Sequence, residues 1–145
     1  IRITATERTM HLATENQRIN TARPSALCSL FDRFLQGELL PQRETAWLRG
    51  LLEGCATGRN KLRAGLPPEV RLGHKTGSSD RTTEGIRIAD NDAGYVVLPD
   101  GRHYCITVLV TDSHHDDARN AGVIAAISEA AYEYITSTQN KNGRP

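Results

Sequence analysis

The sequence lacks a long apolar run: none of its stretches approaches the roughly 20 consecutive apolar residues that a membrane-spanning helix needs. It also lacks an excess of either charge, since 18 basic residues are balanced by 17 acidic ones. The charges are interspersed, and no basic stripe of the kind that binds nucleic acid is present. We therefore expect neither a membrane span nor a nucleic-acid partner.

Cysteine is scarce, and no cluster has the spacing of metal ligands. Cys28, Cys55 and Cys105 are an odd number, and each lies in an apolar run, which favours small core residues. His114 to Asp117 are four adjacent potential ligands, but chain neighbours do not converge easily on one ion and no distant cluster completes a site. We expect no metal there and interpret this run as the turn that starts a helix.

Hydrophobic spacing divides the chain, which has the length of one modest domain, into four segments. Residues 1–20 are polar and predict a loop with one short helical turn. Residues 21–58 carry two helical stripes, the first with Thr21 as a candidate N-cap. Residues 59–137 predict strands and a last helix over about 116–136, and residues 138–145 predict a polar, frayed tail.

Three short segments have the pattern of strands. Residues 69–72 alternate polar and apolar side chains, and residues 94–98 and 104–110 are apolar runs on either side of a Pro-Asp-Gly turn. Residues 78–91 are a polar loop or a strand extension. The pattern predicts an α+β fold with three antiparallel strands flanked by helices.

The stretch with the most chemistry is Gly73-His74-Lys75-Thr76-Gly77-Ser78-Ser79. Lys75 supplies a charge and Thr76 a hydroxyl for a carboxylate. Gly77 lets another molecule lie against the strand edge, where free N–H groups can bind a developing oxyanion. Such a tripeptide also occurs by chance, and the simpler interpretation is a lysine at a strand end followed by a turn.

Four stretches in the same order make the chain resemble the second half of a class A (serine) β-lactamase. They are Lys61–Pro67, Gly73–Ser78, Ala89–Pro99 and Val108–Ser113, the last followed by a C-terminal helix. The resemblance covers Glu7 to about Ile135. It implies a five-stranded antiparallel sheet with helices, of which three strands are present here and the N-terminal part is missing.

The resemblance implies catalytic roles in the first segment, which is similar to the family's omega loop. Glu7 falls at the general base that activates the water hydrolysing the acyl-enzyme; without the resemblance it is a solvated loop acid. His11 falls where many members have an asparagine that holds this water, and a histidine there resembles an extended-spectrum subgroup. Asn20 falls near the acidic residue that usually closes the loop, which puts that closure in question.

The resemblance also implies a substrate-binding set around the lysine strand. Lys75, Thr76, Gly77 and Ser78 would bind the β-lactam, with the N–H of Ser78 as half of the oxyanion hole. Lys61 falls where some members place an arginine that supports the substrate carboxylate; lysine keeps the charge but loses the planar fork of arginine. No metal or organic cofactor is implied.

The main departure from the family is an absence: these residues contain no S-x-x-K and no S-D-N sequence. Acyl transfer needs a nucleophile beside its base, so we expect the chain alone to be inactive and the activity to require a separate N-terminal half. The chain starts at Ile1 rather than Met, which leaves open a native start further upstream. For the full-length protein the resemblance implies a monomer, secreted or periplasmic.

Two alternatives stay open. One is a penicillin-recognising D-alanyl-D-alanine peptidase, which would share the lysine strand but not the glutamate at position 7. The other is a non-catalytic remnant or binding module that keeps the carboxylate pocket.

Overall fold

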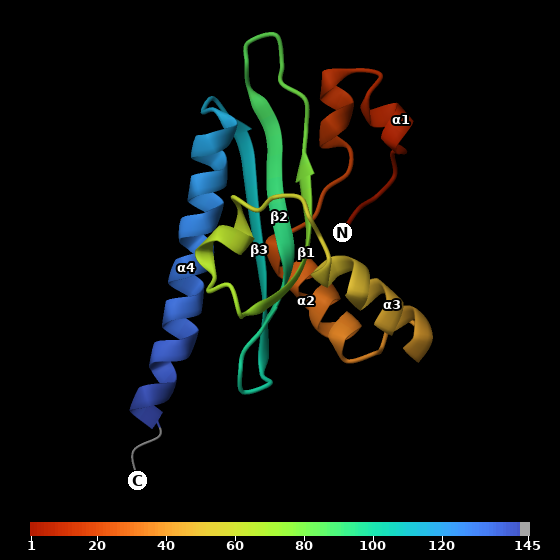
Figure 1. Cartoon of the computed structure of the whole chain (residues 1–145). Helices are drawn as coiled ribbons and strands as arrows, with labels where there is room; N and C mark the ends of the chain where they lie inside the picture. Colours follow the sequence, from red (N-terminus) through yellow and green to blue (C-terminus); the bar gives the residue numbers. More distant parts are fainter. Residues whose placement is uncertain (143–145) are drawn as a thin grey trace.

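The computed structural model describes residues 1–142, with side chains up to Thr138. The predicted α+β fold is confirmed: three antiparallel strands form one sheet in the order β1-β2-β3, with helices on both faces (Figure 1). The elements in chain order are α1 (Glu7–Met10), η1 (Thr14–Arg18), α2 (Pro24–Leu35), α3 (Gln42–Glu53), η2 (Leu62–Gly65), β1 (Arg71–Ser78), β2 (Arg87–Val97), β3 (His103–Ser113) and α4 (Asp117–Asn142).

One face of the sheet carries the main hydrophobic core, which is closed by α4 and the short 3-10 helix η2. Leu62 of η2, Val96 of β2 and Ile124 of α4 are fully buried and meet in this layer. Alternate residues of a strand point to one face, so the even-numbered apolar residues of β1 and β2 supply the sheet side. The core consists of Leu62, Leu66, Val70, Leu72, Val96, Leu98, Ile106, Val108 and Ile124.

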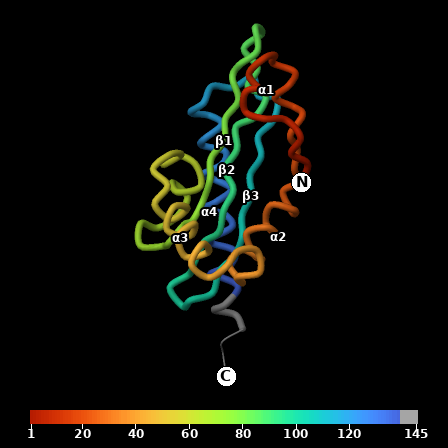
Figure 2. The backbone as a smooth tube through the Cα atoms, turned by 90° about the vertical axis from the view of Figure 1, so that its right-hand side faces the viewer, coloured from red at the N-terminus to blue at the C-terminus, as the bar shows by residue number. Residues whose placement is uncertain are grey.

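The opposite face packs against α2 and α3 around Tyr95. The Tyr95 ring is fully buried, with the rings of Phe31 and Phe34 at centroid distances of 6.2 and 6.4 Å. Its hydroxyl donates to Glu53 Oε1 at 3.2 Å, which links β2 to α3. An ideal Cβ on Gly73 would lie 2.3 Å from this ring, so β1 needs glycine opposite Tyr95. Figure 2 shows α2 in front of the sheet and α4 behind it.

The strands are longer than the local pattern predicted. β1 continues through the lysine stretch to Ser78, and β2 begins at Arg87, seven residues before the apolar run. Pairing explains both extensions, because Ser78 is in register with Asp90 and the two strands support each other across the polar residues. The hairpin predicted around Pro-Asp-Gly is confirmed, with Gly101 at φ +87° in the turn.

The helix ends also differ in detail. The first-turn position of Pro24 is confirmed, but the residue before it, Arg23, is the N-cap, and Thr21 instead forms a backbone bridge with Arg2. α4 begins at Asp117 and runs to Asn142, past the end predicted near residue 136. The last three residues of the predicted tail, 143–145, lie outside the described residues.

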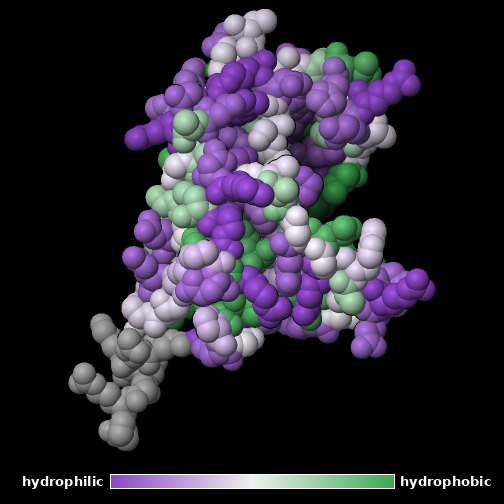
Figure 3. Space-filling view, viewed as in Figure 1, coloured by the Kyte–Doolittle hydropathy of each residue, from purple (hydrophilic) through white to green (hydrophobic). Residues whose placement is uncertain are grey.

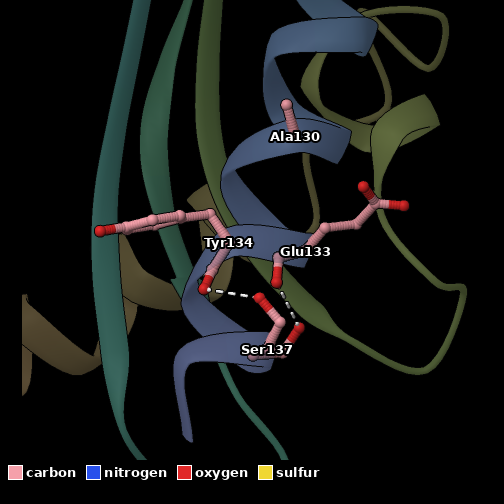
Figure 4. Close-up of a pocket in the computed structure, with 5 residues that line it drawn as sticks. Ala130, Glu133, Tyr134 and Ser137 are labelled. Atoms are coloured by element: carbon pink, nitrogen blue, oxygen red, sulfur yellow. Dashed lines mark hydrogen bonds between the residues drawn. The ribbon is translucent and has the colours of Figure 1, made fainter. Parts of the chain in front are cut away.

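Part of the surface of the described residues is apolar. Val123, Ile127 and Tyr134 lie along α4 at helical spacing and are 44%, 44% and 71% exposed. Figure 4 shows the residues that line a hollow beside Tyr134. The hydrogen bonds marked there stay within α4, and one of them is donated by Ser137 Oγ to the carbonyl of Tyr134. Hydrophobic side chains also show between the polar ones in the space-filling view (Figure 3). The described helices include none with the length and apolar character to cross a bilayer.

The close contact between η2 and α4 gives a stability prediction. A Cβ on Gly65 would lie 2.2 Å from the carbonyl oxygen of Ala125 and 2.6 Å from the amide nitrogen of Glu129. We expect Gly65→Ala to lower the free energy of unfolding by about 1–3 kcal/mol, as overpacking does, in urea denaturation of the native protein that carries these residues.

The matched control is Gly122→Ala in α4, where a Cβ would meet no atom within 4 Å. Alanine should stabilise that helical position by about 0.5–1 kcal/mol. Equal effects of the two substitutions would contradict the proposed tight packing of η2.

Candidate active site

The Lys75-Thr76-Gly77 sequence lies inside β1, at an edge of the sheet. In the described part of the chain β1 pairs with β2 alone, so the N–H and C=O groups of its other edge have no strand partner. A Cβ on Gly77 would find no atom within 4 Å, so glycine leaves open space at that point. An extended ligand can pair with such an edge through main-chain hydrogen bonds.

The side chains along this strand divide between two faces. Lys75 is exposed, and its Nζ donates to the carbonyl of Thr76 at 2.5 Å. Thr76 and Ser78 point to the opposite face, since successive residues of a strand alternate. The Thr76 hydroxyl lies 2.8 Å from that of Thr57. The strand therefore presents one exposed cation on one face and two hydroxyls on the other.

Lys61 lies behind the strand, in a buried polar network. Its Nζ donates to Asp90 Oδ1 at 2.5 Å, to Ser78 Oγ at 3.3 Å and to the carbonyl of Asn91 at 3.4 Å. The side chains of Lys61 and Asp90 are only 9% and 3% exposed. Ser78 Oγ donates in turn to Asp90 Oδ1 at 2.6 Å. Lys61 thus reaches the predicted site through Ser78, and its charge is offset by Asp90.

The other predicted catalytic residues lie on the short helix α1. Thr6 caps this helix by accepting the N–H of Thr9 at 3.2 Å, which places Glu7 in the first turn. His11 follows one turn later on the same side, and its Nε2 lies 3.1 Å from Glu7 Oε1. The hydrogen bond to Glu7, and a second one to Asp80, raise the pKa of the His11 imidazole above its ordinary value of 6.5.

Asn20 closes the N-terminal segment with neutral hydrogen bonds. Its Oδ1 accepts the N–H groups of Thr4 and Ala5, both at 2.9 Å, and its Nδ2 donates to the carbonyl of Ala5 at 2.9 Å. The bridge between Arg2 and Thr21 lies next to these contacts. An asparagine at this position therefore joins the two ends of the segment without an ion pair.

The N-terminal segment and β1 face each other across a pocket of about 550 Å³. All of the predicted site residues except Lys61 line it. The lining residues are Glu7, Met10, His11, Gln17, Asn20, Lys75, Thr76, Gly77, Ser78, Ser79, Ala89 and Asn91. The pocket thus brings a carboxylate, an imidazole, a primary amine and a free strand edge together. The catalytic and binding roles of these residues stay predictions.

Several residues of the site carried no signal in the sequence. Asp80, Gln17 and Asn91 lie at or in the pocket. Gln17 belongs to a stretch that predicted a loop, and Asp80 and Asn91 to one that predicted either a polar loop or a strand extension. If the strand extension is taken, the alternation of side chains along β2 places Asn91 on the same face of the sheet as Lys75. No local pattern could have indicated the contact of Gln17 with Asp80, because 63 residues separate them.

Other ionisable groups singled out by the sequence lie outside this pocket. Asp116 Oδ1 accepts the N–H of Arg119 at 2.7 Å, which confirms the helix start predicted there. Hydrogen bonds from Arg87 and Arg81 lower the pKa of Asp117. Burial raises the pKa of the Cys105 thiol to about 11, so this cysteine is protonated and a poor nucleophile at neutral pH.

Comparisons with known proteins identify the family of the chain. The model of a family described as "Beta-lactamase enzyme family" matches residues 2–135. A beta-lactamase of Bacteroides uniformis is 42% identical over 132 residues, covering 90% of this chain and 45% of that protein. Beta-lactamase VEB-1 of Pseudomonas aeruginosa is 32% identical, covering 92% of this chain and 45% of its own length.

A solved structure shares the fold as well. The class A beta-lactamase from Bacteroides cellulosilyticus superposes with a TM-score of 0.88 at 41% identity, covering 93% of this chain and 48% of that one. The chain therefore spans somewhat less than half the length of the relatives it matches. With a matching family model over most of its residues and relatives well above 30% identity, the chain belongs to the class A serine beta-lactamase family.

Proposed function

We propose that this chain contributes to hydrolysis of the β-lactam amide bond through a serine acyl-enzyme, as part of a protein that confers antibiotic resistance. The observation that carries the proposal is the shared pocket, in which Glu7 faces the free edge of β1 and Lys75. A base on one wall and a cationic strand edge on the other suit an anionic substrate whose carbonyl is attacked between them. Family membership supports the same reaction class.

The residues would divide the work between binding and hydrolysis. Lys75 supplies the charge for the substrate carboxylate, and the Thr76 hydroxyl fixes its orientation. Ser78 Oγ donates its proton to Asp90, so Ser78 would bind the substrate through its backbone N–H. The N–H of Ser78 lies in β1 and serves as one oxyanion donor. Glu7, with His11 beside it, takes a proton from the water that attacks the acyl-enzyme. We assign no step to a metal or organic cofactor.

The serine nucleophile and its lysine would come from outside these residues, in the N-terminal half of the same fold. The apolar stripe Val123, Ile127 and Tyr134 on α4 and the outer edge of β3, unpaired in the described residues, are surfaces that such a half would cover. We propose that the complete protein is monomeric and is exported to the periplasm or the medium, where its substrates act.

The first prediction about activity concerns the chain by itself. The purified 145-residue chain should not turn over a chromogenic cephalosporin, because it contains no S-x-x-K serine. The native protein that carries these residues, assayed beside it, should hydrolyse the same compound. Steady hydrolysis by the isolated chain would overturn the proposed need for an outside nucleophile, and no hydrolysis by the native protein would favour a non-catalytic binding module.

The second prediction separates the two steps of the reaction. In the native protein, Glu7→Gln should still acylate but should lose about 10²- to 10⁴-fold in deacylation rate, the usual contribution of a general base. Mass spectrometry after mixing with penicillin should then show a persistent acyl-enzyme.

The matched control is Glu15→Gln, which removes an acid of the same N-terminal segment that does not line the pocket. It should leave both steps unchanged. Normal turnover by the Glu7→Gln protein would refute the role given to Glu7. A D-alanyl-D-alanine peptidase-like protein would instead show a persistent acyl-enzyme already in the native form, since it has no base for deacylation.

A further inference from the structure

Asp80, the second residue after β1, contacts the N-terminal segment at two side chains. Its Oδ2 lies 3.2 Å from His11 Nδ1 and accepts Gln17 Nε2 at 3.3 Å. Its backbone N–H donates to Gln17 Oε1 at 3.1 Å, so the Gln17 amide meets Asp80 at two points. Neither residue had a predicted role.

The position of Asp80 is fixed by the sheet. The N–H of Ser79 donates to the carbonyl of Ala89 at 2.8 Å, and Ser79 Oγ accepts the N–H of Ala89 at 3.0 Å. Asp80 is thus held by the end of the β1–β2 pair. The N-terminal segment, in contrast, has no buried residue in either α1 or η1 and depends on polar contacts for its place.

The two ring nitrogens of His11 face two different carboxylates. Nε2 lies 3.1 Å from Glu7 Oε1, and Nδ1 lies 3.2 Å from Asp80 Oδ2. A neutral imidazole carries one N–H and can donate to only one of them, whereas the imidazolium donates to both. The full chain of contacts from Glu7 through His11 to Asp80 therefore exists only when His11 is protonated.

We propose that Asp80, with Gln17, is a latch that holds the N-terminal segment on the end of β1 and that protonation of His11 closes this latch onto Glu7. Asp80 is then a positioning residue, because it acts on Glu7 through His11. The catalytic consequence rests on the proposed role of Glu7 as the base. The latch itself rests only on the contacts of Asp80, His11 and Gln17.

The charges around His11 give the direction of the pH dependence. Glu7 and Asp80 favour the imidazolium, and Lys75 is the other basic side chain among the described residues that line the pocket. The pKa of His11 is raised, so the folded state gains stability from its protonation. That gain is fully present below the unfolded pKa and is lost as the pH rises through the folded pKa. The contact between His11 and Glu7 is accordingly strongest at low pH and weakens as the pH rises.

The test is an NMR titration of the His11 ring in the native protein and in its Asp80→Asn variant. Asparagine keeps the shape and the backbone N–H but removes the charge, so the His11 midpoint should shift to lower pH. Amide hydrogen exchange in residues 7–18 should become faster in the same variant. The control is Asp100→Asn, whose carboxylate binds Arg102 in the β2–β3 turn; it should change neither quantity.

Each outcome bears on the latch. An unchanged His11 midpoint in a natively folded Asp80→Asn protein would overturn it. If that variant fails to fold, His11→Gln replaces it: hydrogen exchange in residues 7–18 should then lose its dependence on protonation near neutral pH, and a persisting dependence would refute the proposal. No turnover assay is involved, so the latch and the catalytic role of Glu7 can fail independently.

Discussion

The contact on which much of the structure depends is the buried ion pair between Lys61 and Asp90, 2.5 Å apart. Next to it, Asp92 is fully buried and accepts the N–H of Leu62 at 3.2 Å, and its Oδ1 lies 2.8 Å from His74 Nδ1. Two inward acids of β2 thus fix the segment that carries η2, on which α4 packs. Removing one partner of such a pair leaves a buried charge unpaired, which lowers the free energy of unfolding by about 3–5 kcal/mol.

The same network determines the character of the pocket. One wall is the edge of a sheet whose hydroxyl at Ser78 is tied to Asp90, and the other is a segment whose two short helices bury no residue. The pocket therefore has one rigid wall and one that is held by polar contacts. Among these, the neutral closure at Asn20 holds the ends of the segment, while in its middle His11 contacts Glu7 and Asp80.

Local patterns predicted the elements of the fold better than their limits. Apolar stripes predicted α2 and α4, and the Pro-Asp-Gly turn predicted the hairpin, because these signals depend only on residues close in the sequence. The sequence left residues 78–91 open between a polar loop and a strand extension, because Asp90 and Asp92 are unfavourable in a strand unless distant partners compensate them. Those partners, Lys61 and His74, lie 29 and 18 residues away.

The site shows the same division between pattern and tertiary contact. The resemblance to a family located Glu7 and the Lys75 strand, and the fold brings both to one pocket. It could not reveal that the charge of Lys61 is offset by Asp90, since that depends on which acid lies beneath the strand. A substrate carboxylate on β1 would therefore meet Lys75 directly, whereas Lys61 would act through the orientation of the Ser78 hydroxyl. Because Ser78 Oγ donates its only proton to Asp90, the hydroxyl has only acceptor capacity left and cannot also donate to a carboxylate.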